Sequence, residues 1–314
     1  MRYFKHETKD KKITLYPFVC WHVGAPQCDY EFIDEMVRRL RDDPQGRGIY
    51  LGDGGECVTR SSKGQIYEQT MSPQEQLNWL RNKLQPVKEK LLFGVKGNHG
   101  WRTFKESGLG FDEALCLALG IPYFGTSAFW RLQVRRSIYT IFTHHGLDSG
   151  VAIGTKINKA KKLEEIVLAD AILSAHSHIC TDIPPVHRAY LDGHANVGDA
   201  NRSIKWLSTY GYICGCAYDS RSGYAEDKGY PPILPAHIAI TFFGDSNEHA
   251  KEQTSVVYSV DPNKFRQPNA EDVISRMAST PTPLHCAEHP KYTAQRKPVS
   301  GCEVCWRIWL STKA

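Results

Sequence analysis

Short apolar runs that end at polar clusters alternate along the chain with stretches whose apolar residues recur at helical spacing. The apolar runs predict buried strands, and the helical spacing predicts amphipathic helices. Because strands that alternate with helices are typical of layered proteins, we expect an α/β layered fold. The expected strands are Ile13–Cys20, Gly48–Leu51, Leu91–Val95, Ser137–Thr143 and Ala169–Ser174, and the expected helices are Tyr30–Arg41, Pro73–Lys90, Phe111–Leu119 and Ile157–Val167.

Further apolar runs follow with fewer helices between them, and they predict a second, more β-rich sheet packed on the first. The composition then changes, because residues 261–283 contain four prolines and few large apolar side chains, with one short helix expected at Ala270–Met277. We therefore expect one domain over residues 1–260, a linker over 261–283 and a small separate unit over 284–314. The later strands are expected at Val186–Asp192, Ile204–Ile213, His237–Phe243 and Ser255–Val260.

The composition is typical of a globular protein, since 41% of the residues are hydrophobic and 23% are charged. Lysine and arginine outnumber aspartate and glutamate by 39 to 34, and this surplus of +5 is compatible with an anionic partner without requiring one. The sequence has neither the apolar segment of a secretory signal nor the ~18 consecutive apolar residues of a membrane span. We therefore expect a cytoplasmic protein without a membrane partner, in which the ten cysteines stay reduced.

Polar side chains of metal-ligating types follow each of the five expected strands. In α/β sheets, functional sites form where loops leave the carboxyl ends of strands, so we expect these loops to meet. Each motif alone is ordinary turn chemistry or a hydrogen-bonded histidine, but five in succession are not. Imidazole, carboxylate and amide groups together predict a centre for Zn²⁺, Mn²⁺ or Fe²⁺. In chain order, the side chains are His22, Asp53 with Glu56, Asn98 with His99, His144 with His145, and His176 with His178.

The order of these motifs resembles that of the calcineurin-like metallophosphoesterase family, whose pattern is D-x-H, G-D-x-x-[DE], G-N-H-[DE], H-G and G-H-x-H. The resemblance covers roughly residues 13 to 260. It looks closest to phage-type members, to which this chain is similar around Tyr67–Leu77, Gly97–Gly108 and Gly223–Pro232. The corresponding motifs here are Cys20–His22, Gly52–Glu56, Gly97–Gly100, His145-Gly146 and Ala175–His178.

The resemblance implies a layered β-sandwich flanked by helices and an active site with two divalent metal ions (Mn²⁺, Zn²⁺ or Fe²⁺) bridged by Asp53. It implies that His99 is catalytic. Arg102 and His144 lie beside these motifs, and we expect them to contact phosphate. Hydrolysis would proceed by direct attack of a metal-bound hydroxide, without a covalent phosphoenzyme. One metal would be held by His22, Asp53 and His178 with Cys20, and the other by Asp53, Asn98, His145 and His176.

The chain departs from the family pattern at several positions. Cys20 stands where the family has aspartate, and a thiolate suits Zn²⁺ or Fe²⁺ while disfavouring Mg²⁺. The alternative is that Cys20 packs as a small core residue and that its metal binds weakly or not at all. Gly100 replaces an acid that usually orients the catalytic histidine, and Ala175 replaces a glycine. Glu56 retains an acid, which we expect to hold the ligands in place without binding metal itself.

A second cluster of cysteines lies near the end of the sequence. Two pairs with the spacing C-x₂-[CH], separated by twelve residues, predict a structural zinc site that resembles a zinc ribbon. Zinc would supply the folding free energy that so short a segment lacks. The alternatives are His285 as a ligand, or a set of reduced core cysteines. The expected ligands are Cys286, His289, Cys302 and Cys305.

Basic and aromatic residues around this second cluster can contact a nucleic acid, or they can dock a protein. We expect a phosphodiesterase or nuclease that acts on DNA or RNA, in the host cytoplasm if a phage encodes it. One alternative is a phosphatase or cyclic-nucleotide phosphodiesterase for small molecules. Another, favoured by Cys20 and Gly100, is a catalytically impaired metal-binding module that docks nucleic acid or protein. The tail residues concerned are Lys291, Tyr292, Arg296, Lys297, Trp306, Arg307 and Trp309.

Overall fold

The chain divides into two compact units, Met1–Asp261 and Pro262–Ala314, in a computed structural model. In the second unit, Cys305, Ile308 and Trp309 are described; their backbone is helical, and Cys305 and Ile308 are buried. The expected helix at Ala270–Met277 and the expected zinc ligands Cys286, His289 and Cys302 lie outside the described residues. The described residues are 2–26, 28–62, 64, 66–147, 152–167, 169–178, 181–183, 189–191, 197–199, 209–211, 236–244, 251–259, 305, 308 and 309.

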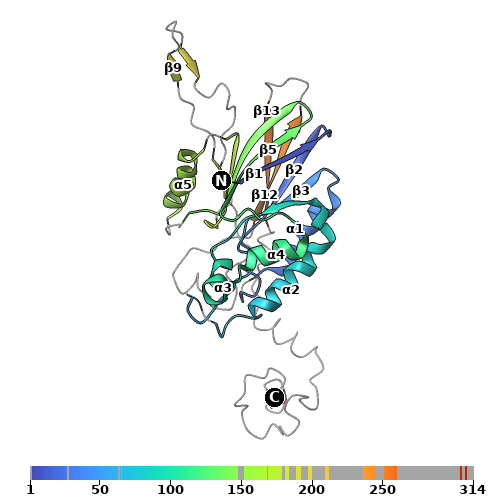
Figure 1. The fold of residues 1–314 in the computed structure, drawn as a ribbon, viewed down its shortest axis with the longest axis vertical. Helices are drawn as coiled ribbons and strands as arrows, with labels where there is room; N and C mark the ends of the chain where they lie inside the picture. Colours follow the sequence, from blue (N-terminus) through green and yellow to red (C-terminus); the bar gives the residue numbers. More distant parts are fainter. Residues whose placement is uncertain are drawn as a thin grey trace. The chain divides into compact units, whose positions relative to one another are not determined.

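Two β-sheets pack face to face in the first unit, and helices lie outside them (Figure 1). The first sheet has the order β13 (Lys251–Ser259), β12 (Ala236–Gly244), β2 (Lys12–Phe18), β3 (Gly46–Tyr50) and β4 (Leu91–Gly94). The second sheet has the order β1 (Arg2–Thr8), β5 (Ser127–Val134), β6 (Ser137–His144), β7 (Ala171–Ser174), β11 (Thr209–Gly211) and β8 (Thr181–Ile183). A separate ribbon pairs β9 (Ala189–Leu191) with β10 (Val197–Asp199).

Strands β2, β3 and β4 run parallel to one another, and β6 runs parallel to β7 in the other sheet. These are five strands that the sequence predicts. The loops that leave their carboxyl ends carry the expected ligands, so the direction of the strands positions the candidate site. Strand β5 pairs with β6 in antiparallel fashion, and β12 pairs in the same way with both β2 and β13.

Helices form where the sequence supplies both an apolar face and a start signal. Helix α1 begins at Asp29, whose side chain accepts a hydrogen bond from the Phe32 backbone N–H, and α2 begins at a capping box between Ser72 and Glu75. Figure 1 shows α1, α2 and α4 gathered on one side of the sheets. The helical segments are α1 (Tyr30–Asp42), α2 (Pro73–Leu84), η1 (Gln85–Lys90), α3 (Gly100–Ser107), α4 (Phe111–Leu119), α5 (Ile153–Lys161) and η2 (Lys162–Glu165).

The main core lies between the two sheets, and a second core lies between the first sheet and its helices. Successive side chains of a strand point to opposite faces, so β2 serves both cores. Leu15 packs between the sheets, whereas Phe18 packs under the helices with Ile33 of α1 and Leu115 of α4. Burial on both faces explains why these parallel strands are near-continuous apolar runs.

The expected mixed α/β fold, with two sheets flanked by helices, is confirmed. The assignment of strands to sheets is wrong in two places. Strands β6 and β7 were expected beside β2, β3 and β4 but belong to the second sheet, and β12 and β13 were expected in the second sheet but belong to the first. Strand β5 creates this second sheet, since it pairs with β6 along its whole length. Strand β5 was not expected from the sequence, although its buried residues alternate strictly: Ala128, Trp130, Leu132 and Val134.

Three further elements were not expected from the sequence. Strand β1 is polar and mixed in charge, and it forms because it pairs in parallel with β5 at the edge of the sheet. Helix α3 directly follows the third ligand motif, and α2 gives way to the 3₁₀ turn η1 at Pro86, where a proline cannot donate a backbone hydrogen bond. Within the described segments, no helix is long and apolar enough to cross a membrane.

Two leucines of α4 test the helix-covered core. Leu115 is fully buried, whereas Leu117 is 81% exposed. We expect Leu115→Ala to lower the free energy of unfolding by about 2–5 kcal/mol, because it leaves a cavity. Leu117→Ala should stay within about 0.5 kcal/mol of the parent. Urea denaturation followed by circular dichroism measures both, and equal effects would contradict the described packing of α4.

Candidate metal centre

The loops after β2 and β3 run side by side and bring the first two motifs together. The backbone N–H of Cys20 donates to the carbonyl of Gly52 at 3.1 Å, and that of His22 donates to the carbonyl of Asp53, also at 3.1 Å. The loop after β4 approaches equally closely, because a Cβ on Gly97 would lie 2.1 Å from Oδ1 of Asp53. Only a residue without a side chain allows this contact, so Gly97 is required there.

Backbone strain is concentrated at the expected ligands. Among the described residues, seven that are not glycine have a positive φ, and five of these seven are expected ligands. A left-handed conformation costs of order 1–3 kcal/mol per residue and persists where the surrounding structure enforces it. The two tightly packed sheets provide that support, and the strain points to a functional site. The five residues are Cys20, His22, Asp53, His176 and His178, with φ between 49° and 65°.

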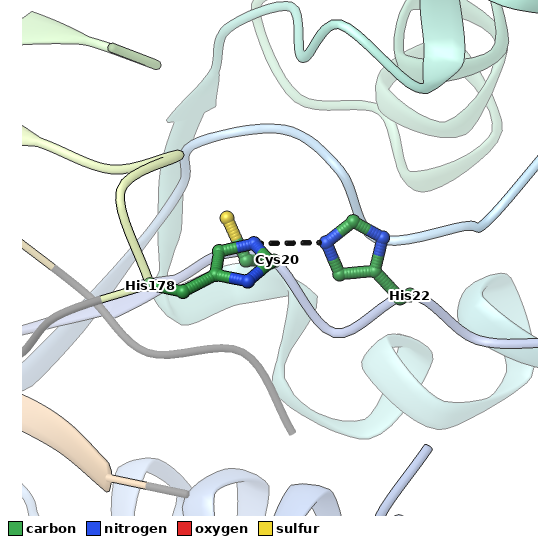
Figure 2. Close-up of side chains that lie close together, drawn as sticks. All are labelled: Cys20, His22 and His178. Atoms are coloured by element: carbon green, nitrogen blue, oxygen red, sulfur yellow. Dashed lines mark hydrogen bonds between the residues drawn. The ribbon is translucent and has the colours of Figure 1, made fainter. Parts of the chain in front are cut away.

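The first group of ligand atoms belongs to Cys20, His22 and His178, all within 4.8 Å of one another. Figure 2 shows the two imidazole rings turned toward each other beside the sulfur atom, with 3.3 Å between their Nε2 atoms. Nδ1 of His22 lies 2.8 Å from a carboxylate oxygen of Glu56, which can only accept, so Nδ1 carries the proton. When the ring of His22 is neutral, its Nε2 lone pair therefore faces this group. Nitrogen and sulfur donors together suit Zn²⁺ or Fe²⁺.

The second group consists of Asp53, Asn98 and His145. Nδ1 of His145 donates to the carbonyl of Leu51 at 2.6 Å, so in the neutral ring Nε2 is a lone pair. Nε2 faces Oδ1 of Asn98 at 3.0 Å and Oδ2 of Asp53 at 2.9 Å. Oδ2 of Asp53 is buried and, while Nε2 of His145 carries no proton, accepts no hydrogen bond. Three electron-pair donors that converge in this way need a proton or a cation between them, so these residues fit a metal ion.

Asp53 connects the two groups. Its carboxylate lies within 4.8 Å of donor atoms of Cys20 and His22 from the first group, of His145 from the second group, and of His99. Burial opposes ionisation, but the nearby His145 and His99 outweigh it and hold the pKa of Asp53 well below its usual value. Asp53 is therefore a charged carboxylate with 1% exposure, placed where a bridging ligand is expected.

His176 is the expected ligand with the weakest geometric support. Its ring centroid lies 5.4 Å from that of His145. Among the described residues, however, His176 belongs to no set of three metal-ligating side chains whose donor atoms all lie within 4.8 Å of one another. Burial, together with His145, lowers the pKa of His176 to about 3, so the ring is neutral and keeps a free electron pair. His176 is chemically suitable as a ligand without being in position in this structure.

His99 is fixed by its backbone and by its ring. Its N–H donates to Oδ1 of Asp53 at 2.7 Å, and its Nδ1 lies 3.1 Å from Oε2 of Glu56. Burial opposes protonation of the ring, but Glu56 and Asp53 outweigh it and raise the pKa of His99. Arg102 donates to Oε1 of Glu56 at 3.0 Å, and its Nη2 lies 3.2 Å from Nε2 of His99. Glu56 thus orients the histidine, a function that the sequence analysis associated with the position of Gly100.

Asp112 of α4 occupies the space that a side chain at position 100 would need. A Cβ on Gly100 would lie 2.2 Å from Oδ2 of Asp112. This buried carboxylate accepts hydrogen bonds from the Gly97 N–H at 2.9 Å and from the Tyr50 hydroxyl. Burial raises the pKa of Asp112 to about 6. Nothing in the sequence singles out Asp112, since an acid in the first turn of a helix is ordinary.

A pocket of about 620 Å³ lies beside the second ligand group and is lined in part by Asn98, Arg102, His144 and His145. Burial, with His145 and Lys96, lowers the pKa of His144 to about 4, so its ring is neutral. Nδ1 of His144 accepts a hydrogen bond from the Gly146 N–H at 2.8 Å, which leaves Nε2 as the donor. Both Arg102 and His144 reach the pocket in which phosphate contacts are expected.

Comparisons with known proteins place the chain near several solved structures at low similarity. No protein-family model matches the chain, and no curated protein matches it. Vacuolar protein sorting 29 from Cryptosporidium parvum is 12% identical with a TM-score of 0.38, over 80% of this chain and 100% of that one. YfcE, a phosphoesterase from E. coli, is 11% identical with a TM-score of 0.35, over 78% of this chain and 98% of YfcE. The NAD nucleotidase of Haemophilus influenzae is 10% identical with a TM-score of 0.36, over 86% of this chain and 56% of the nucleotidase.

Cobalt substitution tests whether Cys20 is a ligand. We expect the Co²⁺-loaded protein to show sulfur-to-cobalt charge-transfer absorption that decreases in Cys20→Ser, because a thiolate ligand is lost. Any absorption from cobalt bound in the tail would be the same in both proteins. Cys28→Ser is the matched control, since the Cys28 thiol is buried and donates to the carbonyl of Trp21 instead. An unchanged absorption in Cys20→Ser would instead favour the small core residue.

Replacement of Asp112 tests its role in the loop after β4. Asparagine would turn an amide N–H toward either the Gly97 N–H or the Tyr50 hydroxyl, so Asp112→Asn should lower the free energy of unfolding by about 1–3 kcal/mol. The neighbouring change Glu113→Gln should have little effect. In a double-mutant cycle, Gly100→Ala should be less harmful when Asp112 is alanine. Additive effects in urea denaturation would show that positions 100 and 112 do not compete for space.

Proposed function

We propose that this protein is a divalent-metal-dependent phosphoesterase that hydrolyses phosphodiester bonds, with DNA or RNA as its substrate. The observation that carries this proposal is the position of one buried, charged carboxylate, Asp53, between two groups of ligand atoms. One group contains Cys20 and His22, and the other contains Asn98 and His145. Paired cation sites that share a carboxylate suit in-line displacement at phosphorus.

The cations would polarise the phosphoryl oxygens and lower the pKa of a water molecule between them. The residues of the chain supply the remaining chemistry. His99, held by Glu56 and by its hydrogen bond to Asp53, would donate a proton to the leaving oxygen or stabilise negative charge there. Arg102, paired with Glu56, keeps His99 in place and adds positive charge at the edge of the pocket.

The preference for nucleic acid is supported by the surplus of basic residues and by the cations that line the pocket. A mononucleotide also fits a volume of about 620 Å³, and this observation favours a phosphatase or cyclic-nucleotide phosphodiesterase as the second candidate. The proposed zinc ribbon would add a further nucleic-acid contact. Hydrolysis of single-stranded DNA, duplex DNA, RNA, cyclic nucleotides and phosphomonoesters by one metal-loaded preparation distinguishes these substrates.

Two substitutions test the centre with bis-p-nitrophenyl phosphate as substrate and Mn²⁺, Zn²⁺ or Fe²⁺ supplied. We expect Asp53→Asn to abolish hydrolysis and to lose the metals of both groups, because the shared carboxylate is gone. His99→Ala should keep the metals and lower kcat by about 10²–10⁴-fold, as expected for loss of general acid catalysis. The matched controls are Asp34→Asn on the exposed face of α1 and His6→Ala on the edge strand β1.

Metal analysis of the same proteins separates the enzyme from a binding module. About three metal ions per chain, of which Asp53→Asn retains one, would support two ions at the centre and one in the tail. A single ion that disappears in Cys302→Ser would favour the impaired module that docks nucleic acid or protein. Full activity of Asp53→Asn would refute the proposed centre.

A further inference from the structure

The pocket beside Asn98 and His145 is larger than the reacting phosphate alone requires. Its walls come from the loop after β3, from the end of β6 and from the segment Lys96–Lys105, which follows β4 and includes the first turns of α3. Among the described residues, none of the side chains that line it is acidic, while Lys96, Arg102 and Lys105 are basic. A concave, acid-free surface of this kind attracts anions.

Lys96 is held over the pocket by an aromatic platform. Its ammonium nitrogen lies 4.2 Å from the ring centroid of Trp101. Trp101 in turn stacks on Phe104, with ring centroids 4.0 Å apart and an interplanar angle of 13°. The cation–π contact reduces the freedom of the lysine side chain while leaving its three N–H donors for a ligand. Lys105 follows Trp101 by one helical turn, so both lie on the same face of α3.

Two acids beside the pocket, Glu56 and Glu106, have other partners. Glu56 pairs with Arg102 and His22, and Glu106 accepts hydrogen bonds from Ser61 at the rim of the pocket. Arg102 is therefore neutralised in part by Glu56. No ion pair within 4 Å is found for Lys96 or Lys105 among the described residues, so their charges are available to an anion in the pocket.

We infer that Lys96 and Lys105 bind a second phosphate group of the substrate while the metal centre holds the reacting one. This inference rests on the proposed function. The substrate would then be a molecule with at least two phosphates, either a nucleic-acid chain or a nucleoside polyphosphate. A cyclic mononucleotide or a simple diester has one phosphate and leaves both lysines without an anionic partner.

Matched substrates test the second phosphate directly. A dinucleoside monophosphate has one phosphate, the same dinucleotide with a 5′-phosphate has two, and a nucleoside triphosphate represents the other source. We expect the parent protein to show a lower KM for the two-phosphate dinucleotide. In Lys96→Ala and in Lys105→Ala, this preference should fall by roughly tenfold, as expected for loss of one charge-assisted contact. Lys96→Arg and Lys105→Arg should retain most of it.

Lys88→Ala removes one positive charge from an exposed lysine that does not line the pocket, and it should leave the preference unchanged. The salt dependence of KM for a single-stranded oligonucleotide should also weaken by about one unit of slope in each pocket variant, but not in Lys88→Ala. A preference for the triphosphate over the dinucleotide would identify the nucleoside polyphosphate as the source of the second phosphate.

An unchanged preference in both alanine variants would overturn the inference while hydrolysis of bis-p-nitrophenyl phosphate still supports the proposed function. If the parent protein hydrolyses none of these substrates, the proposed function fails, and binding then tests the pocket by itself. Fluorescence anisotropy with a labelled 5′-phosphorylated oligonucleotide should then show weaker binding to both alanine variants than to the parent and to Lys88→Ala. Equal binding by all four proteins would refute the anion site.

Discussion

The buried negative charge of Asp53 is the constraint on which the rest of the site depends. Removing a carboxylate from water is costly unless hydrogen bonds and positive charge compensate it. Here Oδ1 accepts the backbone N–H of His99, and Oδ2 faces Nε2 of His145. Burial opposes protonation of His145, but Asp53 outweighs it and raises the pKa of that ring. The protons on these histidines occupy positions that a cation would take, because a metal ion and a proton compete for the same electron pairs.

The two packed sheets allow this arrangement to exist. Five expected ligands have left-handed backbone, and Gly97 approaches Asp53 at a distance that no side chain would permit. Loops under such strain would relax if they were not fixed at both ends. Strands β2, β3 and β4 fix the loops of one sheet, and β6 and β7 fix those of the other. The apolar core between the sheets therefore positions the polar groups at their edge.

Two departures from the family pattern acquire a physical meaning in the structure. Gly100 does not leave a vacancy, because the carboxylate of Asp112 fills the space and binds the loop through the Gly97 N–H. Glu56 contacts both His22 and His99, so one acid orients two histidines. Cys20 is fully buried among the core residues between the sheets, and its sulfur also lies near the rings of His22 and His178 (Figure 2). The geometry around these positions is compatible with a metal centre.

The sequence by itself determined the types and order of the expected ligands, most strand ends and most of the amphipathic helices, because each of these is a local pattern of residues. The alternation in β5 was also present in the sequence, but the sheet to which β6 and β7 belong was not. Only the tertiary structure decided to which sheet β6 and β7 belong. It also decided the parallel pairing of β1, the contact between Asp112 and Gly100, and the placement of Lys96 on Trp101 in the pocket that His145 lines. Each depends on residues that meet only after the two sheets have packed, and local periodicity contains no record of such contacts.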